Sequence, residues 1–302
     1  MNIKCNFFIV GAPKCGTTAW ANYLATHPNI CFARPKEPHY FNTDMPGFRW
    51  AQSGSEYNNY FSHYNGETVV AEASPQYLFS RTAARNIFEY NPHAKILILL
   101  RDPYSFLRSY HNQLLLNGDE DISSFEEAWR APYPRSDGEW PRHCREPMLL
   151  DYRSCGKFSI HIKRFLDIFG PRQVKIMKME DWSYNPLRAY AEILNFLGLE
   201  DDGRREFPKI HKARSERFRL AHSLYRHPPR LLRSASRIVR RVPIFGVSLH
   251  TMARTAFFQI GTKGGYKSND DALLRREIQE YFKNDQVMVA SLQASREERG
   301  ET

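Results

Sequence analysis

The sequence predicts a three-layer α/β fold with a central parallel sheet flanked by helices. Short apolar segments that are typical of buried strands alternate with segments of helical periodicity. The first apolar segment runs straight into a glycine-containing turn and then a helical pattern, as strands of parallel sheets do. A chain of 302 residues, 42% of them hydrophobic, is also long enough to bury a large core.

Each element follows from local pattern. The segments expected to form strands are Lys4–Val10, Val69–Ala73, Lys95–Arg101 and Gln173–Lys178. Helical patterns lie near residues 17–27, 80–90, 103–117, 157–169, 185–197 and 269–293. Residues 132–147, rich in proline and charge, are expected to form a loop. No internal repeat interrupts this order, which predicts a single domain over residues 1–302 with ligands bound beyond the carboxyl ends of the strands.

The formal net charge of +10 is concentrated in one segment. Residues 212–254 hold one lysine, ten arginines and one glutamate, which accounts for the whole net charge. Apolar residues at helical spacing from Pro229 onward predict a basic amphipathic insertion there. It is interpreted either as a packed helix with a solvated arginine face, or as a surface for an anionic membrane or an acidic glycan. No nucleic-acid partner is expected, because no module of that kind accompanies the charge.

The remaining bulk features indicate a cytoplasmic enzyme, peripheral at the inner membrane face if the basic helix binds lipid. The sequence has no apolar segment of transmembrane length, and a strand is expected from Lys4, which leaves no room for a signal peptide. The five cysteines have no paired or zinc-binding spacing and are expected to be reduced. No carboxylate cluster suits a metal, so no metal is expected.

Residues 11–18, Gly-Ala-Pro-Lys-Cys-Gly-Thr-Thr, predict a P-loop-like phosphate site between a strand and a helix. Free backbone N–H groups and the positive end of the helix dipole favour an anion there, and Lys14 adds a full charge. Thr17 and Thr18 supply hydroxyl donors. Because Lys14 precedes Gly16, whereas a Walker A loop places its lysine after the final glycine, the motif is not a Walker A loop.

Two further segments carry phosphate-binding chemistry. Arg101 ends a predicted strand and Ser109 follows two turns into the next helix, which suits a phosphate monoester. The alternative is that Arg101 only pairs with Asp102 or caps a carbonyl. Residues 261–267, Gly-Thr-Lys-Gly-Gly-Tyr-Lys, predict a cationic lid whose backbone can close on phosphate.

In this order along the chain, the three segments resemble sulfotransferases that use 3′-phosphoadenosine 5′-phosphosulfate (PAPS), over residues 5 to 290 approximately. Residues 36–41 and 72–77 are most similar to the glycan type, the heparan sulfate-like O- and N-sulfotransferases and their bacterial relatives. The resemblance implies PAPS as donor and 3′-phosphoadenosine 5′-phosphate (PAP) as product. It implies these cofactor-binding residues: Lys14, Cys15, Gly16, Thr17, Thr18, Arg101, Ser109, Lys263, Gly264, Gly265, Tyr266 and Lys267. Cys15 lies at a helix N-terminus, which would lower its thiol pKa, but it is interpreted as a passive loop residue.

Sulfuryl transfer resembles phosphoryl transfer, an in-line displacement that depends on positioning and charge. Lys14 is expected to stabilise the leaving phosphate. The resemblance makes Glu37 the candidate base, with His39 as a second candidate or an orienting partner. The alternative for Glu37 is a salt bridge with Lys36 or Arg34.

Two departures from the glycan type concern the acceptor. Ala73 stands where those enzymes often have lysine, and Asn42 stands where they often have an acid. The expected acceptor is therefore a hydroxyl of a carbohydrate, glycolipid or secondary metabolite, without a specific heparan-like assignment. Two other functions stay open: a P-loop-type small-molecule kinase, and a non-catalytic nucleotide-dependent membrane adaptor that uses the arginine helix.

Overall fold

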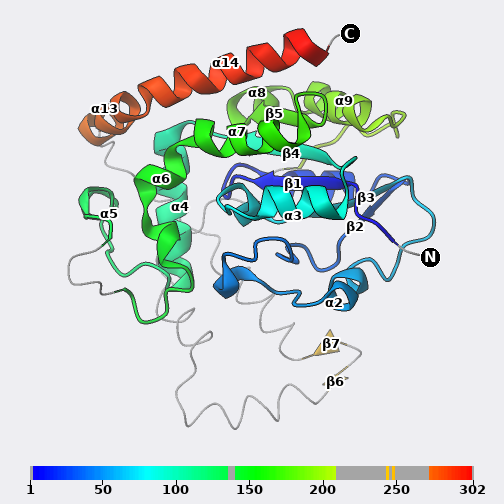
Figure 1. Cartoon of the computed structure of the whole chain (residues 1–302), viewed down its shortest axis with the longest axis horizontal. Helices are drawn as coiled ribbons and strands as arrows, with labels where there is room; N and C mark the ends of the chain where they lie inside the picture. Colours follow the sequence, from blue (N-terminus) through cyan, green and yellow to red (C-terminus); the bar gives the residue numbers. More distant parts are fainter. Residues whose placement is uncertain (1–2, 135–139, 209–242, 245–246, 249–271, 301–302) are drawn as a thin grey trace.

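The structure is a computed structural model that describes residues 3–134, 140–208, 243–244, 247–248 and 272–300, with side chains described up to residue 294. Its centre is a five-stranded sheet (Figure 1). The strands are β1 (Phe7–Gly11), β2 (Ile30–Phe32), β3 (Val69–Ala73), β4 (Lys95–Leu100) and β5 (Val174–Lys178). They lie in the order β2-β3-β1-β4-β5, and every pairing is parallel. The predicted α/β class is confirmed.

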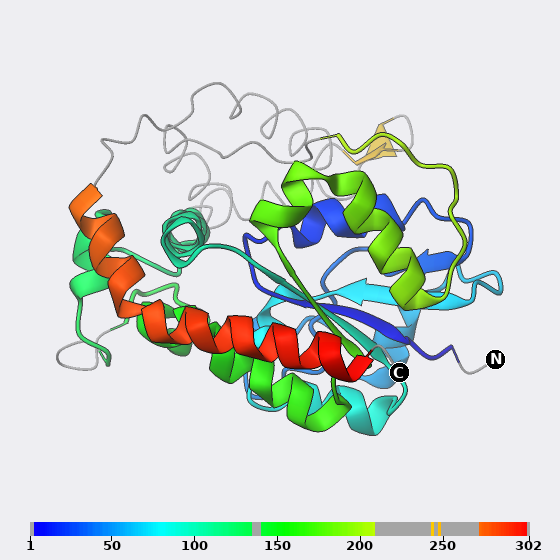
Figure 2. The same ribbon diagram turned by 90° about the horizontal axis from the view of Figure 1, so that it is seen from above.

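Helices cover both faces of the sheet. They are α1 (Thr17–Leu24), α2 (Gly54–Asn59), α3 (Ala83–Tyr90), α4 (Pro103–Asn117), α5 (Phe125–Arg130), α6 (Tyr152–Gly156), α7 (Phe158–Phe169), α8 (Met179–Tyr184), α9 (Pro186–Leu197), α13 (Ala272–Tyr281) and α14 (Lys283–Gly300). Figure 2 shows α1, α8 and α9 on one face of the sheet, and α3 and α7 on the other. Helix α14 packs against α7 as an outer element. Short 3-10 turns follow at η1 (Pro46–Phe48), η2 (Pro75–Leu78) and η4 (Pro147–Leu150).

The ends of α4 follow from the sequence. The Asp102 carboxylate accepts a hydrogen bond from the backbone N–H of Ser105 at 3.1 Å, and Pro103 occupies the first helical position. Gly118 ends the helix with a left-handed backbone. Two residues therefore separate β4 from α4. The helix fixes the direction in which Ser109 and Gln113 project.

The buried strands explain the core. Every residue of β1 and β3 is buried, as expected for a parallel sheet covered on both faces. The sequence does not predict strand β2, because three residues are too few to show a hydrophobic pattern typical of a strand. The helix expected over 269–293 is two helices, which meet at Phe282. That ring is fully buried, and a side chain at Gly156 would overlap it.

Two predicted segments lie wholly or mostly outside the residues that the structure describes. The basic insertion over 212–254 lies outside them, apart from the antiparallel pair β6 (Pro243–Ile244) and β7 (Val247–Ser248). The lid residues 261–267 also lie outside them. Within the part of the chain that is described, no helix is both long and apolar enough to cross a membrane. All five cysteines are described, and none forms a disulfide.

Candidate active site

Four strands lead directly from their carboxyl ends into the predicted site residues. Strand β1 leads into residues 11–18, β2 into the segment with Glu37 and His39, β3 into residues 74–77, and β4 into Arg101. Because the strands are parallel, these segments leave the sheet at one edge. The chain passes from β1 to the edge strand β2, returns through β3 beside β1, and then crosses to β4 and β5 on the other side of β1, so this edge is a topological switch point, where α/β sheets bind ligands.

The phosphate loop is tied to the sheet and opens into a helix. The backbone N–H of Ala12 donates to the carbonyl of Leu99 on β4 at 2.6 Å. Gly16 has φ 92° and precedes the first residue of α1, Thr17, without a side-chain cap. The first N–H groups of α1 therefore start at the switch-point edge, in the arrangement that binds anions at helix N-termini.

Gly16 also permits a close contact behind the loop. A side chain at this position would overlap the indole ring of Trp182 on α8. The ring of Trp182 meets that of Trp20 edge to face, with centroids 5.6 Å apart. Position 16 thus requires glycine both for its left-handed backbone and for space.

The other loop residues take distinct positions. The Lys14 ammonium donates to Oε1 of Gln113 on α4 at 3.2 Å, which places its charge between the loop and that helix. Thr17 is buried and Thr18 half-buried. Cys15 is fully buried, and this burial raises the pKa of its thiol. The lowered pKa that its place beside Lys14 suggested is wrong, because desolvation outweighs the nearby positive charges.

Arg101 and Ser109 are both half-buried at the same edge. The Asp102 side chain is engaged as the cap of α4, and its backbone N–H donates to Glu180 at 3.1 Å. Within the described residues, neither the Arg101 guanidinium nor the Ser109 hydroxyl makes a hydrogen bond or ion pair with another side chain. The Arg101–Asp102 pair that the sequence left open is therefore not formed there, and both groups are available to an anion.

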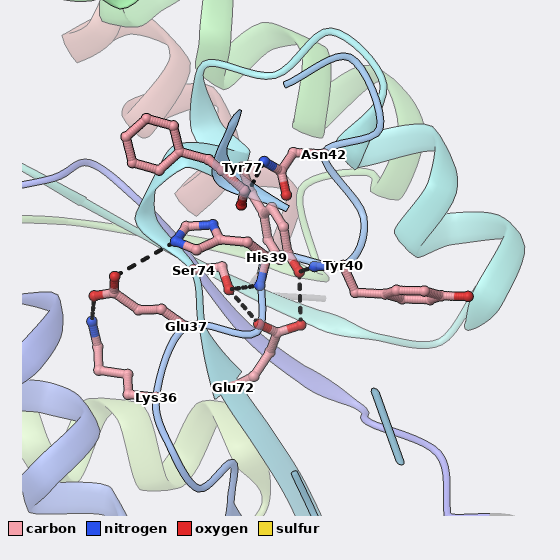
Figure 3. A network of polar contacts seen from close by, with 9 residues as sticks. Lys36, Glu37, His39, Tyr40, Asn42, Glu72, Ser74 and Tyr77 are labelled. Carbon is pink, nitrogen blue, oxygen red and sulfur yellow. Dashed lines mark hydrogen bonds and ion pairs between the residues drawn. The ribbon is translucent and has the colours of Figure 1, made fainter. Parts of the chain in front are cut away.

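Glu37 lies between a cation and an imidazole (Figure 3). Its carboxylate forms an ion pair with Lys36, and its Oε2 lies 3.5 Å from Nε2 of His39. The Glu37 side chain is 38% exposed. Partial burial raises its pKa, but the hydrogen bond from His39 and the charge of Lys36 outweigh this and lower the pKa to about 2. Glu37 is thus ionised at neutral pH, and the Lys36 salt bridge left open by the sequence does form.

The imidazole of His39 is enclosed. Its side chain is 1% exposed and meets the rings of Phe48 and Tyr77 edge to face, at 6.0 and 5.9 Å. Burial lowers the pKa of His39, although the Glu37 carboxylate acts in the opposite direction. Its Nδ1 has no hydrogen-bond partner among the residues described. A neutral imidazole donating to Glu37 through Nε2 fits this arrangement and leaves Nδ1 as an acceptor.

The three residues expected to carry the chemistry share an unusual backbone. Among the described non-glycine residues, positive φ occurs at Lys14 (64°), Glu37 (71°) and His39 (48°). This left-handed region is sparsely populated by residues with a Cβ, and it persists where surrounding contacts hold it. Such positions concentrate at functional sites.

A buried carboxylate that sequence reasoning did not single out lies beneath this segment. Glu72 on β3 is fully buried and accepts from the hydroxyls of Ser74 and Tyr77 (Figure 3). It also accepts from the hydroxyl of Tyr57. Burial raises its pKa to about 7, and the three hydroxyl donors act against this shift. Tyr77 is fully buried, so it packs in the interior and does not line a cleft. Glu72 was within the 72–77 motif, but its partner Tyr57 is remote in sequence.

The two departures from the glycan pattern lie in the interior. Ala73 is fully buried at the end of β3. Asn42 is also fully buried; its Nδ2 donates to the Phe48 carbonyl at 3.5 Å, and its Oδ1 has no partner among the described residues. The loop after β2 and the end of β3 thus lack the two charges that the glycan pattern would place there.

A cavity of about 340 Å³ adjoins the Glu37 segment. Its lining residues precede and follow Glu37 in the sequence: Arg34, Pro35, Trp50, Ala51, Glu56, Asn59 and Tyr60. The Trp50 side chain is 50% exposed. Its loop is tied down where Arg49 donates to the carbonyls of Tyr40 and Gln52, both at 3.3 Å. The cavity therefore combines a half-exposed aromatic ring with charged and amide groups.

The described residues offer no group of three or more histidine, cysteine, aspartate or glutamate side chains that could hold a metal ion. The charges at the switch-point edge come instead from Lys14, Lys36 and Arg101. Side-chain cations and backbone N–H groups are the groups with which proteins bind anions.

The family of the chain agrees with this geometry. Residues 4–217 match the sulfotransferase domain family, and the chain belongs to it. The family resemblance that residues 11–18, 101–109 and 36–41 carry is thereby confirmed. A crystal structure of a sulfotransferase from Alicyclobacillus acidocaldarius is 32% identical, with a TM-score of 0.59, over 70% of this chain and 87% of that one.

Curated relatives include glycan enzymes. The bifunctional heparan sulfate N-deacetylase/N-sulfotransferase 1 of Caenorhabditis briggsae is 27% identical over 208 residues, and carbohydrate sulfotransferase 15 of Rattus norvegicus is 22% identical over 260 residues. Each match covers 65% of this chain. It covers 23% of the first relative's length and 44% of the second's. The shared part is therefore the sulfotransferase region of longer proteins.

Proposed function

We propose that this chain transfers the sulfuryl group of PAPS to a hydroxyl of a carbohydrate, glycolipid or secondary-metabolite acceptor. The observation that carries the proposal is the meeting of Lys14, Arg101 and Glu37 at one switch-point edge. Lys14 and the N-terminus of α1 suit the 5′-phosphosulfate, while Arg101 and Ser109 suit the 3′-phosphate. Glu37 lies on the loop that follows β2, at the same edge, and is the proposed base for the acceptor hydroxyl.

In the proposed reaction the acceptor oxygen attacks sulfur in line with the bond to the 5′-phosphate. The new S–O bond forms as the old one breaks, the hydroxyl proton passes to Glu37, and PAP leaves with the bonding electrons. Lys14 neutralises the charge that develops on the leaving phosphate oxygen. His39 orients the Glu37 carboxylate through Nε2, which its neutral state and its burial support.

The cavity beside Glu37 supports a ring-shaped acceptor. A half-exposed tryptophan with charged and amide neighbours can stack on the apolar face of a sugar while its hydroxyls are hydrogen-bonded. Since Ala73 and Asn42 supply no charge, the acceptor proposal extends to sugars and metabolites beyond heparan sulfate.

Calorimetric titration of the protein with PAP in the absence of metal, beside ATP with Mg²⁺, tests the proposal. We expect PAP to bind and ATP to bind far more weakly. Binding of ATP but not PAP would instead support the kinase alternative. A third outcome, PAP binding without transfer of labelled sulfate to any acceptor in a carbohydrate and metabolite panel, would support the non-catalytic adaptor.

A further inference from the structure

Glu72 gathers three hydroxyl groups around one buried carboxylate. The Tyr57 hydroxyl donates to its Oε1 at 2.9 Å, and the Tyr77 hydroxyl donates to the same oxygen at 3.1 Å. The Ser74 hydroxyl donates to Oε2 at 2.6 Å. Each hydroxyl is the donor in its contact with Glu72, so its proton points toward the carboxyl group and its oxygen lone pairs face away.

Two of these hydroxyls use those lone pairs to hold the loop that follows β2. Ser74 Oγ accepts from the backbone N–H of His39 at 3.1 Å. The Tyr77 oxygen accepts from the N–H groups of Tyr40 at 2.8 Å and Phe41 at 3.3 Å. Figure 3 shows the bonds that connect Glu72 through Ser74 to His39 and through Tyr77 to Tyr40. The loop amides are thereby satisfied by side chains rather than by a neighbouring strand.

This loop has a backbone that needs such support. Glu37 and His39 both adopt left-handed φ values, of 71° and 48°. A non-glycine residue in this region costs of order 1 kcal/mol or more, so the conformation depends on its surroundings. The amide contacts at residues 39–41 lie directly beside the two strained residues and fix where their side chains project.

We propose that Glu72 is a positioning residue for the Glu37–His39 pair and acts through the hydroxyls of Ser74 and Tyr77. The proposal rests on the proposed function insofar as it assigns the pair a catalytic role. Its geometric content is independent of that role: without the buried carboxylate, the hydroxyls lose the direction that lets them accept the loop amides.

Tyr57 provides a matched control within the same network. It donates to the same Glu72 oxygen as Tyr77, but none of its hydrogen bonds given by the structure reaches an amide of residues 39–41. Tyr57→Phe and Tyr77→Phe therefore each remove one buried donor to Glu72, while only the second removes an acceptor for the loop. A general loss of stability would affect the two variants alike.

The test compares Glu72→Gln, Ser74→Ala and Tyr77→Phe with Tyr57→Phe and with Ser74→Thr, which keeps the hydroxyl. The first readout is the NMR titration of the His39 imidazole in histidine-labelled protein, assigned with His39→Gln. We expect its chemical shift or apparent pKa to change in the first three variants and to stay as in the wild type in Tyr57→Phe and Ser74→Thr. An unchanged His39 signal in Tyr77→Phe and Ser74→Ala overturns the proposal.

The second readout is sulfate transfer, with PAP affinity measured in parallel. A misplaced Glu37 should lower kcat by ~10- to 100-fold with PAP affinity retained, because positioning errors near the reacting atoms affect the chemical step. Equal losses of kcat in Tyr57→Phe and Tyr77→Phe would overturn the positioning role. Failure of the wild type to bind PAP would reject the proposed function alone, since the His39 titration still decides whether Glu72 positions the loop.

Discussion

The carboxylate of Glu37 and the imidazole of His39 lie 3.5 Å apart, although both residues have a left-handed backbone. With one residue between them, this geometry brings both side chains to the same side of the loop. It pairs an ionised carboxylate with a buried neutral imidazole. The relationship defines the first experiment on the reaction itself.

Glu37→Gln should abolish most of the turnover. The amide has the same shape but cannot accept the acceptor proton, so we expect kcat to fall by ~10²- to 10⁴-fold, the usual contribution of a general base. PAP affinity should stay within about twofold, because Glu37 does not face the nucleotide in the proposal. Steady-state kinetics and calorimetry check both values. The exposed Glu89→Gln is the control, and equal activity of the two variants would remove Glu37 from the reaction.

Lys36→Met should shift the pH dependence of turnover. The Lys36 charge helps to hold the pKa of Glu37 at about 2, so its removal raises that pKa toward the ordinary value of 4.5. A base is active only when deprotonated, and the acid limb of the kcat profile should therefore move to higher pH. The profile is measured from pH 4 to 8. A shift in the opposite direction would contradict the ion pair.

Arg101→Ala and Ser109→Ala should weaken PAP binding. A hydrogen bond to a charged group contributes about 1.5–3 kcal/mol, which corresponds to a ~10- to 100-fold rise in Kd for each variant. Ser105→Ala, one turn earlier on α4, is the matched control and should bind PAP as the wild type does. If all three variants bind equally well, the 3′-phosphate is held elsewhere.

Glu72 should make the protein less stable as the pH rises. Its pKa is raised to about 7 in the folded chain, from 4.5, so the folded state holds the proton more tightly than the unfolded state. The associated stability is present below pH 4.5 and is lost as the pH rises through about 7, by about 3 kcal/mol. Urea unfolding at pH 5 and 7.5 measures this loss. Glu72→Gln should reduce the difference, and an identical difference in the variant would refute the assignment.

The basic segment supplies a separate prediction. If residues 212–254 contact lipid, the protein should sediment with vesicles containing about one-third phosphatidylserine at low salt and should be released at high salt. Vesicles of phosphatidylcholine alone are the control. Equal sedimentation with both lipids, or none with either, would leave a packed helix with a solvated arginine face as the interpretation of this segment.

The sequence predicts most of the fold because its signals are local. Val69–Ala73 and residues 103–117 are predicted with the bounds that β3 and α4 have in the structure. Ile30–Phe32 was not recognised as a strand, since a three-residue edge strand is defined by its pairing with β3 and not by its own composition. The same limit applies to burial: the sequence shows that Lys14 stands beside Cys15, but only the structure shows that Cys15 is buried, and this burial raises the pKa of its thiol.

Some features of the candidate site are also local in sequence, and others depend on the folded chain. Lys14, Glu37 and His39 stand in short motifs, whereas the left-handed backbone that they share could not be read from residue types that rarely adopt it. The sequence places Glu72 in a buried strand but does not predict its hydrogen-bond partners. Its hydrogen bond with Tyr57 spans 15 positions, and its proposed role depends on amides 31 to 33 positions earlier; only the folded chain brings these groups together.

The contact between Gly16 and Trp182 gives the protein a built-in optical probe. The Trp182 ring packs directly behind the turn that is proposed to receive the phosphosulfate, and it lies next to the ring of Trp20. A charge arriving on the front of the turn changes the electric field at this indole pair without touching it. Intrinsic fluorescence can therefore follow occupancy of the turn in unlabelled protein, and Trp182→Phe identifies the ring that reports it.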